Sequence, residues 1–402
     1  METYIIEWLS LIFRWLHVIT GVAWIGASFY FVWLDNSLQN PPQWKKDKGI
    51  KGDLWAIHGG GIYEVAKYKL QPEKMPETLH WFKWEAYSTW ITGMLLLAII
   101  YYLGADSYLI DKRVADLTQL QAIAIGLGVI AASWVVYALL CSSTLAKNGL
   151  VISALLIIFA AAIAYLLTQL FSGRGAYIHF GAVIGTLMAG NVFRVIIPGQ
   201  KALVAAIHDN KEPDAKWAEK AKLHSTHNTY LTLPLLFIMI SSHYPLTYDH
   251  HFNWLILLAI TAITALARQF FILKHKGIHK HSILIISAMA TLALAILIAP
   301  KQIAPIGNTD NIDREQLSAQ ILSIINARCT TCHAKNPTDD IFTTAPDGVV
   351  LETMDDIYQW APHINARSVQ SHNMPFMNKT GMTQEERNTV ARWLEMEDQL
   401  TN

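Results

Sequence analysis

The sequence predicts an all-α protein: a polytopic membrane bundle of about eight transmembrane helices, followed by a small helical domain outside the membrane. The first observation behind this prediction is composition, since 52% of the 402 residues are hydrophobic and only 15% charged, against roughly 25% charged in soluble proteins. The second is a series of long apolar runs, and the third is a return to ordinary charge density after Pro300. We therefore divide the chain into a membrane domain (1–300), a linker (301–312) and a C-terminal domain (313–402).

The apolar runs are each about 20 residues long, enough to cross ~30 Å of hydrocarbon, and charged or turn residues bound them. A large buried bundle in a soluble protein is the alternative, but so many runs with so few charges favour the lipid bilayer. The predicted spans are 5–34, 80–103, 119–140, 148–171, 174–197, 224–244, 250–272 and 281–299.

The distribution of charge predicts the orientation. The 31 basic and 31 acidic side chains balance, so no global field attracts a polyanion and we expect no nucleic-acid partner. Lysines gather in the loops after the first, third, fifth and seventh spans, whereas the opposite loops hold only Lys112, Arg113 and Arg174. The positive-inside rule then places the lysine-rich loops in the cytoplasm and both chain ends outside.

Two amphipathic helices are expected in the C-terminal domain. Leu317, Ile321, Ile324 and Ile325 recur at helical spacing in a helix that ends just before Cys329. Thr383 and Glu386 form a capping box that opens a second helix near the C-terminus.

The strongest motif of the chain is Cys329-Thr330-Thr331-Cys332-His333, the C-x-x-C-H pattern of covalent haem c attachment. Cys329 and Cys332 lie one helical turn apart, as addition to the two vinyl groups of one porphyrin requires, and His333 is placed to ligate the iron. A thioredoxin-like redox pair would need a βαβ context and a zinc site two more ligands, and neither is visible. We therefore expect one haem c in a class I-like cytochrome c domain, which places the protein in a bacterial inner membrane with this domain in the periplasm.

A second iron ligand is expected some tens of residues after the motif. Met374 is well placed to supply a thioether, which would raise the reduction potential and suit an electron acceptor. The alternatives are Met377 and Met382, or His363 and His372 for a bis-histidine iron.

Two histidines lie deep in the predicted spans, His17 in the first and His179 in the fifth. Ionisable groups inside a bilayer are costly and point to function. Two neutral imidazoles from different helices are how a bundle holds a b-type haem, so His17 and His179 are candidate ligands of a haem b. The alternative is that each histidine hydrogen-bonds a neighbouring helix.

A cluster of polar residues is expected near the cytoplasmic ends of the fifth and sixth spans. Arg194 and Asn191 should approach the level of His224 and His227, which share a helix face as a base and its orienting partner would. With neighbouring aromatic rings these groups would form a pocket for a flat, anionic heterocycle. The alternative for Arg194, and the favoured interpretation for Arg268, is that the side chain extends to the interface.

The cytoplasmic loop contains His58-Gly59-Gly60-Gly61. Three glycines permit close approach of the backbone to a ligand, but a glycine-rich turn is the more common explanation. Together with His80, Lys83 and Glu85, this segment is a weaker candidate for part of an inner site.

At several positions the sequence resembles the membrane-bound, cytochrome-c-fused urate oxidases (urate hydroxylases) of bacteria. The resemblance implies oxidation of urate to 5-hydroxyisourate, with electrons passed to the cytochrome domain and the respiratory chain and no hydrogen peroxide formed. A soluble cytochrome c or a terminal oxidase would then accept the electrons. The segments that carry the resemblance are Arg14–Val18, Val22–Gly26, Gly190–Gln200, His227–Pro234 and Cys329–His333.

Other interpretations stay open at this point. Without a membrane haem, an inner pocket is too far from haem c, and urate would have to bind near the outer face, around His179, His243, His250 and His251. A quinol-to-cytochrome c oxidoreductase would use the same haems with a lipid-soluble donor. A non-enzymatic electron relay is the third alternative, but the large loop and buried arginines are more than a relay needs.

Overall fold

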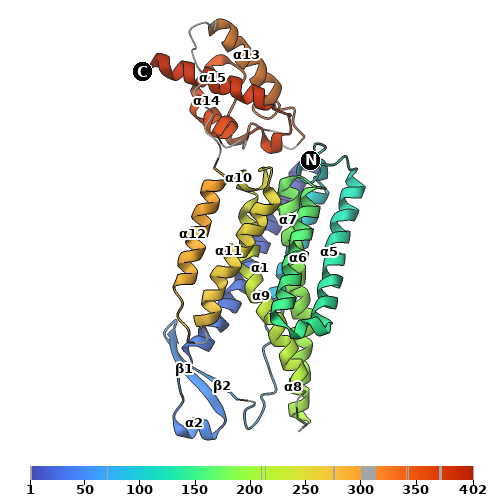
Figure 1. Cartoon of the computed structure of the whole chain (residues 1–402), viewed down its shortest axis with the longest axis vertical. Helices are drawn as coiled ribbons and strands as arrows, with labels where there is room; N and C mark the ends of the chain where they lie inside the picture. Colours follow the sequence, from blue (N-terminus) through green and yellow to red (C-terminus); the bar gives the residue numbers. More distant parts are fainter. Residues whose placement is uncertain are drawn as a thin grey trace.

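A computed structural model describes residues 2–69, 71–209, 211–212, 214–274, 277–299, 314–340, 342, 344–370 and 374–401. The predicted linker, 301–312, lies outside the described residues, as do the boundary residues 300 and 313. Figure 1 shows a long helical bundle with the C-terminal domain at one end and a β hairpin at the other. We call these the domain end and the hairpin end.

A helix occupies each of the eight predicted spans, and five of the helical segments are long and apolar enough to cross a membrane by length and composition. The long helices are α1 (Glu2–Ser37), α3 (Trp84–Leu96), α5 (Gln119–Ser142), α6 (Gly149–Thr168), α7 (Gly173–Asn191), α8 (Ile197–His208), α9 (Ala215–Ser241), α11 (Asn253–Lys274) and α12 (Ser282–Leu297). Short helices α2 (Gln43–Asp47), α4 (Ala105–Tyr108) and α10 (Pro245–Tyr248) lie between them. π-Helical turns at Leu97–Tyr102 and Val192–Ile196 continue α3 and α7.

Polar N-caps start several of these apolar helices. The Thr118 side chain accepts the backbone N–H of Gln121 in a capping box at α5, and the side chains of Asn148 and Ser172 cap α6 and α7. Without such acceptors the first N–H groups of each helix would be unsatisfied. The turn residues between apolar runs therefore set where each helix begins.

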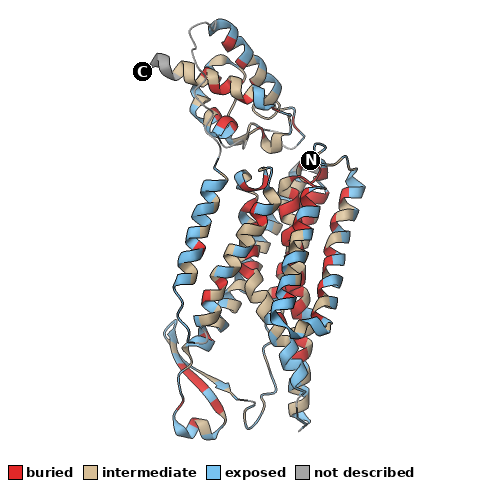
Figure 2. Ribbon diagram, in the orientation of Figure 1, coloured by how far each residue is buried: buried red, intermediate tan, exposed pale blue. Residues whose placement is uncertain are grey.

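Helix α7 is the centre of the bundle. In the continuous segment α7–α8, 56% of the most apolar window is buried, against 6% in α1. Figure 2 shows the buried residues concentrated on α7 and its neighbours, whereas α12 is exposed along almost its whole length. In a bilayer, α1 and α12 would face lipid and the polar groups on α7 would be shielded from it.

The prediction of an all-α chain missed a β hairpin in the 35–79 loop. Strand β1 (Ile50–His58) pairs antiparallel with β2 (Gly61–Tyr68), and His58 lies opposite Gly61. Gly59 and Gly60 connect the strands with φ values of +56° and +80°, which a two-residue hairpin turn requires and glycine adopts without strain. The glycine-rich segment is therefore a turn.

The C-terminal domain contains α13 (Arg314–Arg328), α14 (Met354–Ile364) and α15 (Gln384–Thr401). Helix α13 ends directly before Cys329, as predicted, and buries Leu317, Ile321 and Ile325 in a core shared with α14 and α15. The predicted capping box is confirmed, because Thr383 Oγ1 accepts the Glu386 N–H and Glu386 accepts the Thr383 N–H. The core is separate from that of the bundle.

Candidate functional site

A pocket of about 340 Å³ opens near the hairpin end of the bundle, between α5, α7 and the start of α9. It contains a cation from each of two elements, Arg194 and Lys220, together with the imidazole of His224 and the indoles of Trp134 and Trp217. Arg194 lies in the π-helical turn after α7, a local distortion that is frequent at functional sites. The complete lining is Trp134, Ala138, Cys141, Ser142, Arg194, Val195, Trp217, Lys220 and His224.

The structure thus brings Arg194 and His224 to one pocket, as the sequence predicts. His224 is buried, and its Nδ1 lies 2.9 Å from the Lys220 carbonyl oxygen. A carbonyl only accepts, so Nδ1 carries the proton and Nε2 is an unprotonated acceptor. His224 can therefore take a proton from a bound molecule.

His227 does not line the pocket but lies directly behind it. Its ring centroid is 6.0 Å from that of His224, and its Nδ1 is 2.7 Å from the hydroxyl of Tyr137. The Asn191 amide donates to the same hydroxyl over 2.9 Å, so Tyr137 donates its own proton to His227. The proton of a neutral His227 consequently resides on Nε2.

The orientation of this network is fixed from the backbone. Asn228 Nδ2 donates to the Met188 carbonyl over 3.0 Å, which leaves Asn228 Oδ1 to accept Asn191 Nδ2 over 2.8 Å. Asn191 then presents a donor, never an acceptor, to Tyr137. A backbone carbonyl thus determines the tautomer of His227 through three side chains.

Sequence reasoning missed the contribution of α5 to the pocket. Trp134, Ala138 and Cys141 are spaced four and three residues apart and so share one face of this helix. The spacing shows that they lie together, but the sequence does not show which helix they face. Gly190 allows α7 to approach, because a Cβ there would lie 2.5 Å from the Trp134 ring. The glycine thereby places this indole at the pocket.

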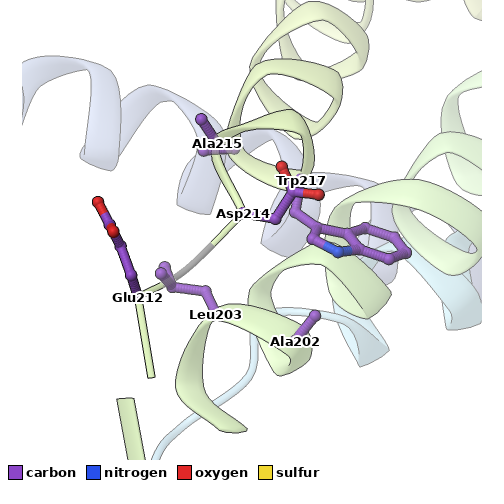
Figure 3. Close-up of a pocket in the computed structure, with 7 residues that line it drawn as sticks. Ala202, Leu203, Glu212, Asp214, Ala215 and Trp217 are labelled. Carbon is purple, nitrogen blue, oxygen red and sulfur yellow. The ribbon is translucent and has the colours of Figure 1, made fainter. Parts of the chain in front are cut away.

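A second pocket of about 250 Å³ lies at the turn between α8 and α9 (Figure 3). It is lined by Glu212, Asp214 and apolar residues, and Asp214 is engaged as the N-cap of α9. Its lining includes neither a cation nor an imidazole. It therefore suits an anionic heterocycle much less well than the Arg194 pocket does.

His17 and His179 do not form a pair in the structure. His17 Nδ1 contacts the Thr89 carbonyl and the Thr92 hydroxyl on α3, each at 3.1 Å. His179 is fully buried, its Nδ1 2.9 Å from the Gly175 carbonyl and its Nε2 3.3 Å from the Tyr102 hydroxyl.

Space at His179 is also limited. A Cβ on Gly126 would lie 2.6 Å from its Nε2, and the ring packs against Phe171 at 4.8 Å. The Nδ1 contacts leave the Nε2 lone pair of each ring available, as in a metal-ligating histidine, but the Tyr102 hydroxyl already contacts Nε2 of His179. The haem b stays a prediction from the sequence.

The histidines of the outer alternative lie in different surroundings. His250 and His251 stack on each other at 4.3 Å in a turn at the domain end, whereas His179 lies inside the bundle. The expectation for Arg268 is corrected: the residue is only 2% exposed and its Nε donates to the Thr229 carbonyl, so it does not extend to the interface.

The C-x-x-C-H segment lies at the end of α13 in the C-terminal domain. His333 Nδ1 is 3.0 Å from the Val349 carbonyl, which fixes the proton on Nδ1 and leaves Nε2 as a lone-pair donor, the arrangement that a metal-ligating histidine needs. Burial raises the pKa of the Cys329 thiol to about 12, and burial together with Asp339 raises that of Cys332 to about 11. A redox-active dithiol would need the opposite shift.

A zinc site is also disfavoured, because no group of three or more His, Cys, Asp or Glu side chains gathers anywhere in the described part of the chain. The donor set at Cys329, Cys332 and His333 therefore fits covalent haem c better than either alternative. Arg328 ties the motif to α15 through the Glu386 carboxylate, with N–O distances of 3.0 to 3.2 Å.

The backbone of Met374 is held from two sides. Its N–H donates to the Arg367 carbonyl over 2.9 Å, and its carbonyl accepts Arg387 Nη1 over 2.8 Å. Of the alternatives, Met382 is buried in the domain core and His363 is exposed beside Trp360. His372 lies outside the described residues. Met374 as the second ligand, with Met377 as an alternative, stays a prediction from the sequence.

Together, the fold and the pocket define a helical bundle, with five helical segments long and apolar enough to span a membrane among the described residues, that carries a cationic, aromatic pocket near one end and a small helical domain at the other. Residues 3–299 match the family model described as urate oxidase N-terminal, and with well over half of the chain matched, the protein belongs to this family. The resemblance noted in the sequence is thus confirmed for the bundle, and the C-terminal domain lies beyond the match. Comparison with curated proteins and with solved structures finds no significant match.

Proposed function

We propose that the protein is a membrane-bound enzyme that oxidises urate to 5-hydroxyisourate and passes the electrons to a haem c in its C-terminal domain. Urate and one water give 5-hydroxyisourate, two protons and two electrons. Because oxygen is not the electron acceptor, no hydrogen peroxide is formed. The observation that carries the proposal is the convergence of Arg194, Lys220 and His224 with two indoles, in a chain of the urate oxidase N-terminal family.

Each group in the pocket has a function that urate chemistry requires. Arg194 and Lys220 would hold the urate anion, the guanidinium through paired hydrogen bonds. Trp134 and Trp217 offer flat surfaces for the purine. The unprotonated Nε2 of His224 would accept a proton as the substrate is oxidised, and His227 would support it from behind.

The C-terminal domain would hold the electron acceptor. Cys329 and Cys332 would attach haem c, and His333 and Met374 would ligate its iron; when bound, this group takes up electrons one at a time. A soluble cytochrome c or a terminal oxidase would then oxidise it. The lysine distribution supports both chain ends outside the cytoplasm, and the haem c motif supports a bacterial inner membrane with these ends in the periplasm. Of the eight spans proposed, five meet the length and composition criterion in the structure.

The positions of the two sites impose one requirement. Trp134 lies 15 residues from the start of α5 at the domain end, or about 22 Å along the helix at ~1.5 Å per residue. The proposal therefore requires an electron carrier between the pocket and the C-terminal domain.

The experiment that tests the substrate is an anaerobic absorption spectrum of the oxidised, purified protein before and after addition of urate, with a quinol as the parallel donor. Reduction of a c-type band by urate is expected, and a b-type band would identify the intermediate carrier. Reduction by the quinol alone would refute the proposal in favour of a quinol-to-cytochrome c oxidoreductase. Reduction by neither donor would leave an electron relay.

The pocket is tested by Arg194→Gln and Lys220→Gln. Loss of a hydrogen bond to a charged group costs about 1.5–3 kcal/mol, so kcat/KM for urate should fall about 10- to 150-fold. Lys222→Gln is the matched control, because Lys222 is exposed on the same helix and does not line the pocket. Unchanged turnover in Arg194→Gln would exclude this pocket as the urate site.

A further inference from the structure

The C-terminal domain contacts the domain end of the bundle through the segment that follows Met374. The Phe376 ring lies edge-on to Tyr108 with centroids 5.9 Å apart. The Arg174 guanidinium, at the start of α7, lies 4.9 Å from the Tyr108 ring and 5.4 Å from the Phe376 ring. One cation of the bundle is thus placed between an aromatic ring of each domain.

Two hydrogen bonds flank this aromatic contact. Ser107 donates to the Asp340 carboxylate over 3.2 Å, and Arg113 donates to the Met377 carbonyl over 3.4 Å. Asp111 holds Arg113 in place by accepting hydrogen bonds from its Nε and Nη2, at 3.0 and 2.7 Å. The contact therefore has an apolar centre and a polar rim, as specific interfaces do.

The face of the C-terminal domain that makes this contact is the one beside its candidate iron ligand. Phe376 is two residues from Met374, and Arg387 fixes that segment by donating to the Met374 carbonyl. On the bundle side, Arg174 Nε donates to the Tyr101 hydroxyl over 3.1 Å, and the Tyr101 ring lies 6.5 Å from His179. A continuous series of rings thus leads from the interior of the bundle to the Met374 segment.

We propose that this contact is the electron-entry dock of the cytochrome domain, formed by Tyr101, Tyr108 and Arg174, with Phe376 as the positioning residue. The inference rests on the proposed function for the source of the electrons. It adds that electrons from the bundle enter haem c at the Met374 side, and that the external acceptor must use another face, since this one is covered by the protein's own bundle.

Crosslinking tests the docked arrangement without any enzyme assay. Ser107→Cys combined with Asp340→Cys should be joined in high yield by a short bis-methanethiosulfonate reagent in the full-length haem-loaded protein. The matched control pairs Ser107→Cys with Gln320→Cys, an exposed position on α13, whose buried face packs within the domain core, and should not react. Equal yields from the two pairs, or none from the first, would overturn the dock.

The role in electron entry is tested by the rate of haem reduction. Phe376→Ala should lower both the crosslinking yield and the rate of haem c reduction by urate about ten-fold, which lies between the scales of an exposed and a desolvated cation–π contact, since Phe376 is half-buried. Its haem reduction potential and its oxidation by soluble cytochrome c should stay unchanged. Tyr358→Ala, on α14, is the control aromatic substitution and should leave the rate unchanged.

The rate of haem reduction in the crosslinked protein gives the converse measurement. The crosslinked protein should be reduced at least as fast as the uncrosslinked one; a ten-fold slower reduction would show that electrons enter elsewhere. If urate reduces no haem but quinol does, the same comparison is made with quinol. Failure of the proposed substrate and failure of the dock are then separate results.

Discussion

The hydroxyl of Tyr137 is the point at which the network behind the pocket can be broken with least disturbance. Tyr137→Phe removes one oxygen from a side chain that is 1% exposed. It deletes the hydrogen bonds to His227 and from Asn191, of 2.7 and 2.9 Å, and leaves the Nδ1 atom of His227 with only the Cys141 thiol, 4.0 Å away.

The magnitude follows from these contacts. Two hydrogen bonds contribute about 0.5–1.5 kcal/mol each, and each buried polar group left unsatisfied costs about 1–3 kcal/mol. We expect the free energy of unfolding to fall by about 2 kcal/mol or more. If the same ~2 kcal/mol maintains the tautomer of His227 during turnover, kcat falls about 30-fold. KM should be unchanged, because Tyr137 does not line the pocket.

Two assays separate these effects: thermal unfolding in detergent, and anaerobic stopped-flow measurement of haem reduction by urate. Tyr165→Phe is the matched control, since this tyrosine is 52% exposed on α6 and should tolerate the change. A Tyr137→Phe protein that is destabilised but turns over normally would show that the network serves only stability. Full stability together with full activity would refute the hydrogen-bond assignment itself.

Three further predictions concern stability. Burial of the Glu386 carboxylate opposes its ionisation, but a backbone N–H at the start of α15 and the Arg328 guanidinium outweigh this and lower its pKa. The resulting stabilisation is present above the pKa of the unfolded chain and is lost as the pH falls through the folded pKa. Glu386→Gln, which keeps the capping box, should therefore lower the free energy of unfolding by about 1 kcal/mol at pH 7 and leave it unchanged in acid. The effect is small because both partners are partly exposed. An equal decrease at every pH in urea titrations would contradict this. Gly126→Ala should lower the melting temperature, because the new Cβ would lie 2.6 Å from His179 Nε2; an unchanged melting temperature would show that the ring moves freely. Ile321→Ala, at a fully buried core position, should cost about 2–5 kcal/mol in the C-terminal domain, and a loss below 1 kcal/mol by denaturant titration would mean that this core is loosely packed.

Local patterns were sufficient for most of the architecture. Apolar runs of membrane length placed a helix at all eight positions, and capping residues placed the start of α15. The β hairpin was not predicted although its Gly59-Gly60 turn is a strong local signal, because apolar and polar residues do not alternate cleanly along either strand. The family was identified from the same local motifs and is confirmed over residues 3–299.

The candidate site could be predicted only in part. Arg194 and His224 each lie near the end of a helix, and the predicted order of the spans places these two ends at the same level of the bundle. Their proximity could therefore be predicted from the spans alone. The face of α5 that meets them could not be predicted in the same way. A helix that is apolar on all sides has no polar stripe, so its rotation about its own axis cannot be derived from the sequence. Trp134, Tyr137 and Cys141 therefore entered the site only with the structure.

The sequence by itself determined the helical bundle, the C-x-x-C-H segment and the family, since each depends on the order and spacing of neighbouring residues. Tertiary structure alone decided that His17 contacts Thr89 and His179 contacts Tyr102, that the Met188 carbonyl orients His227, and that Phe376 meets Arg174. These are contacts between residues far apart in the chain. They depend on helix rotation and domain placement, which no local spacing encodes.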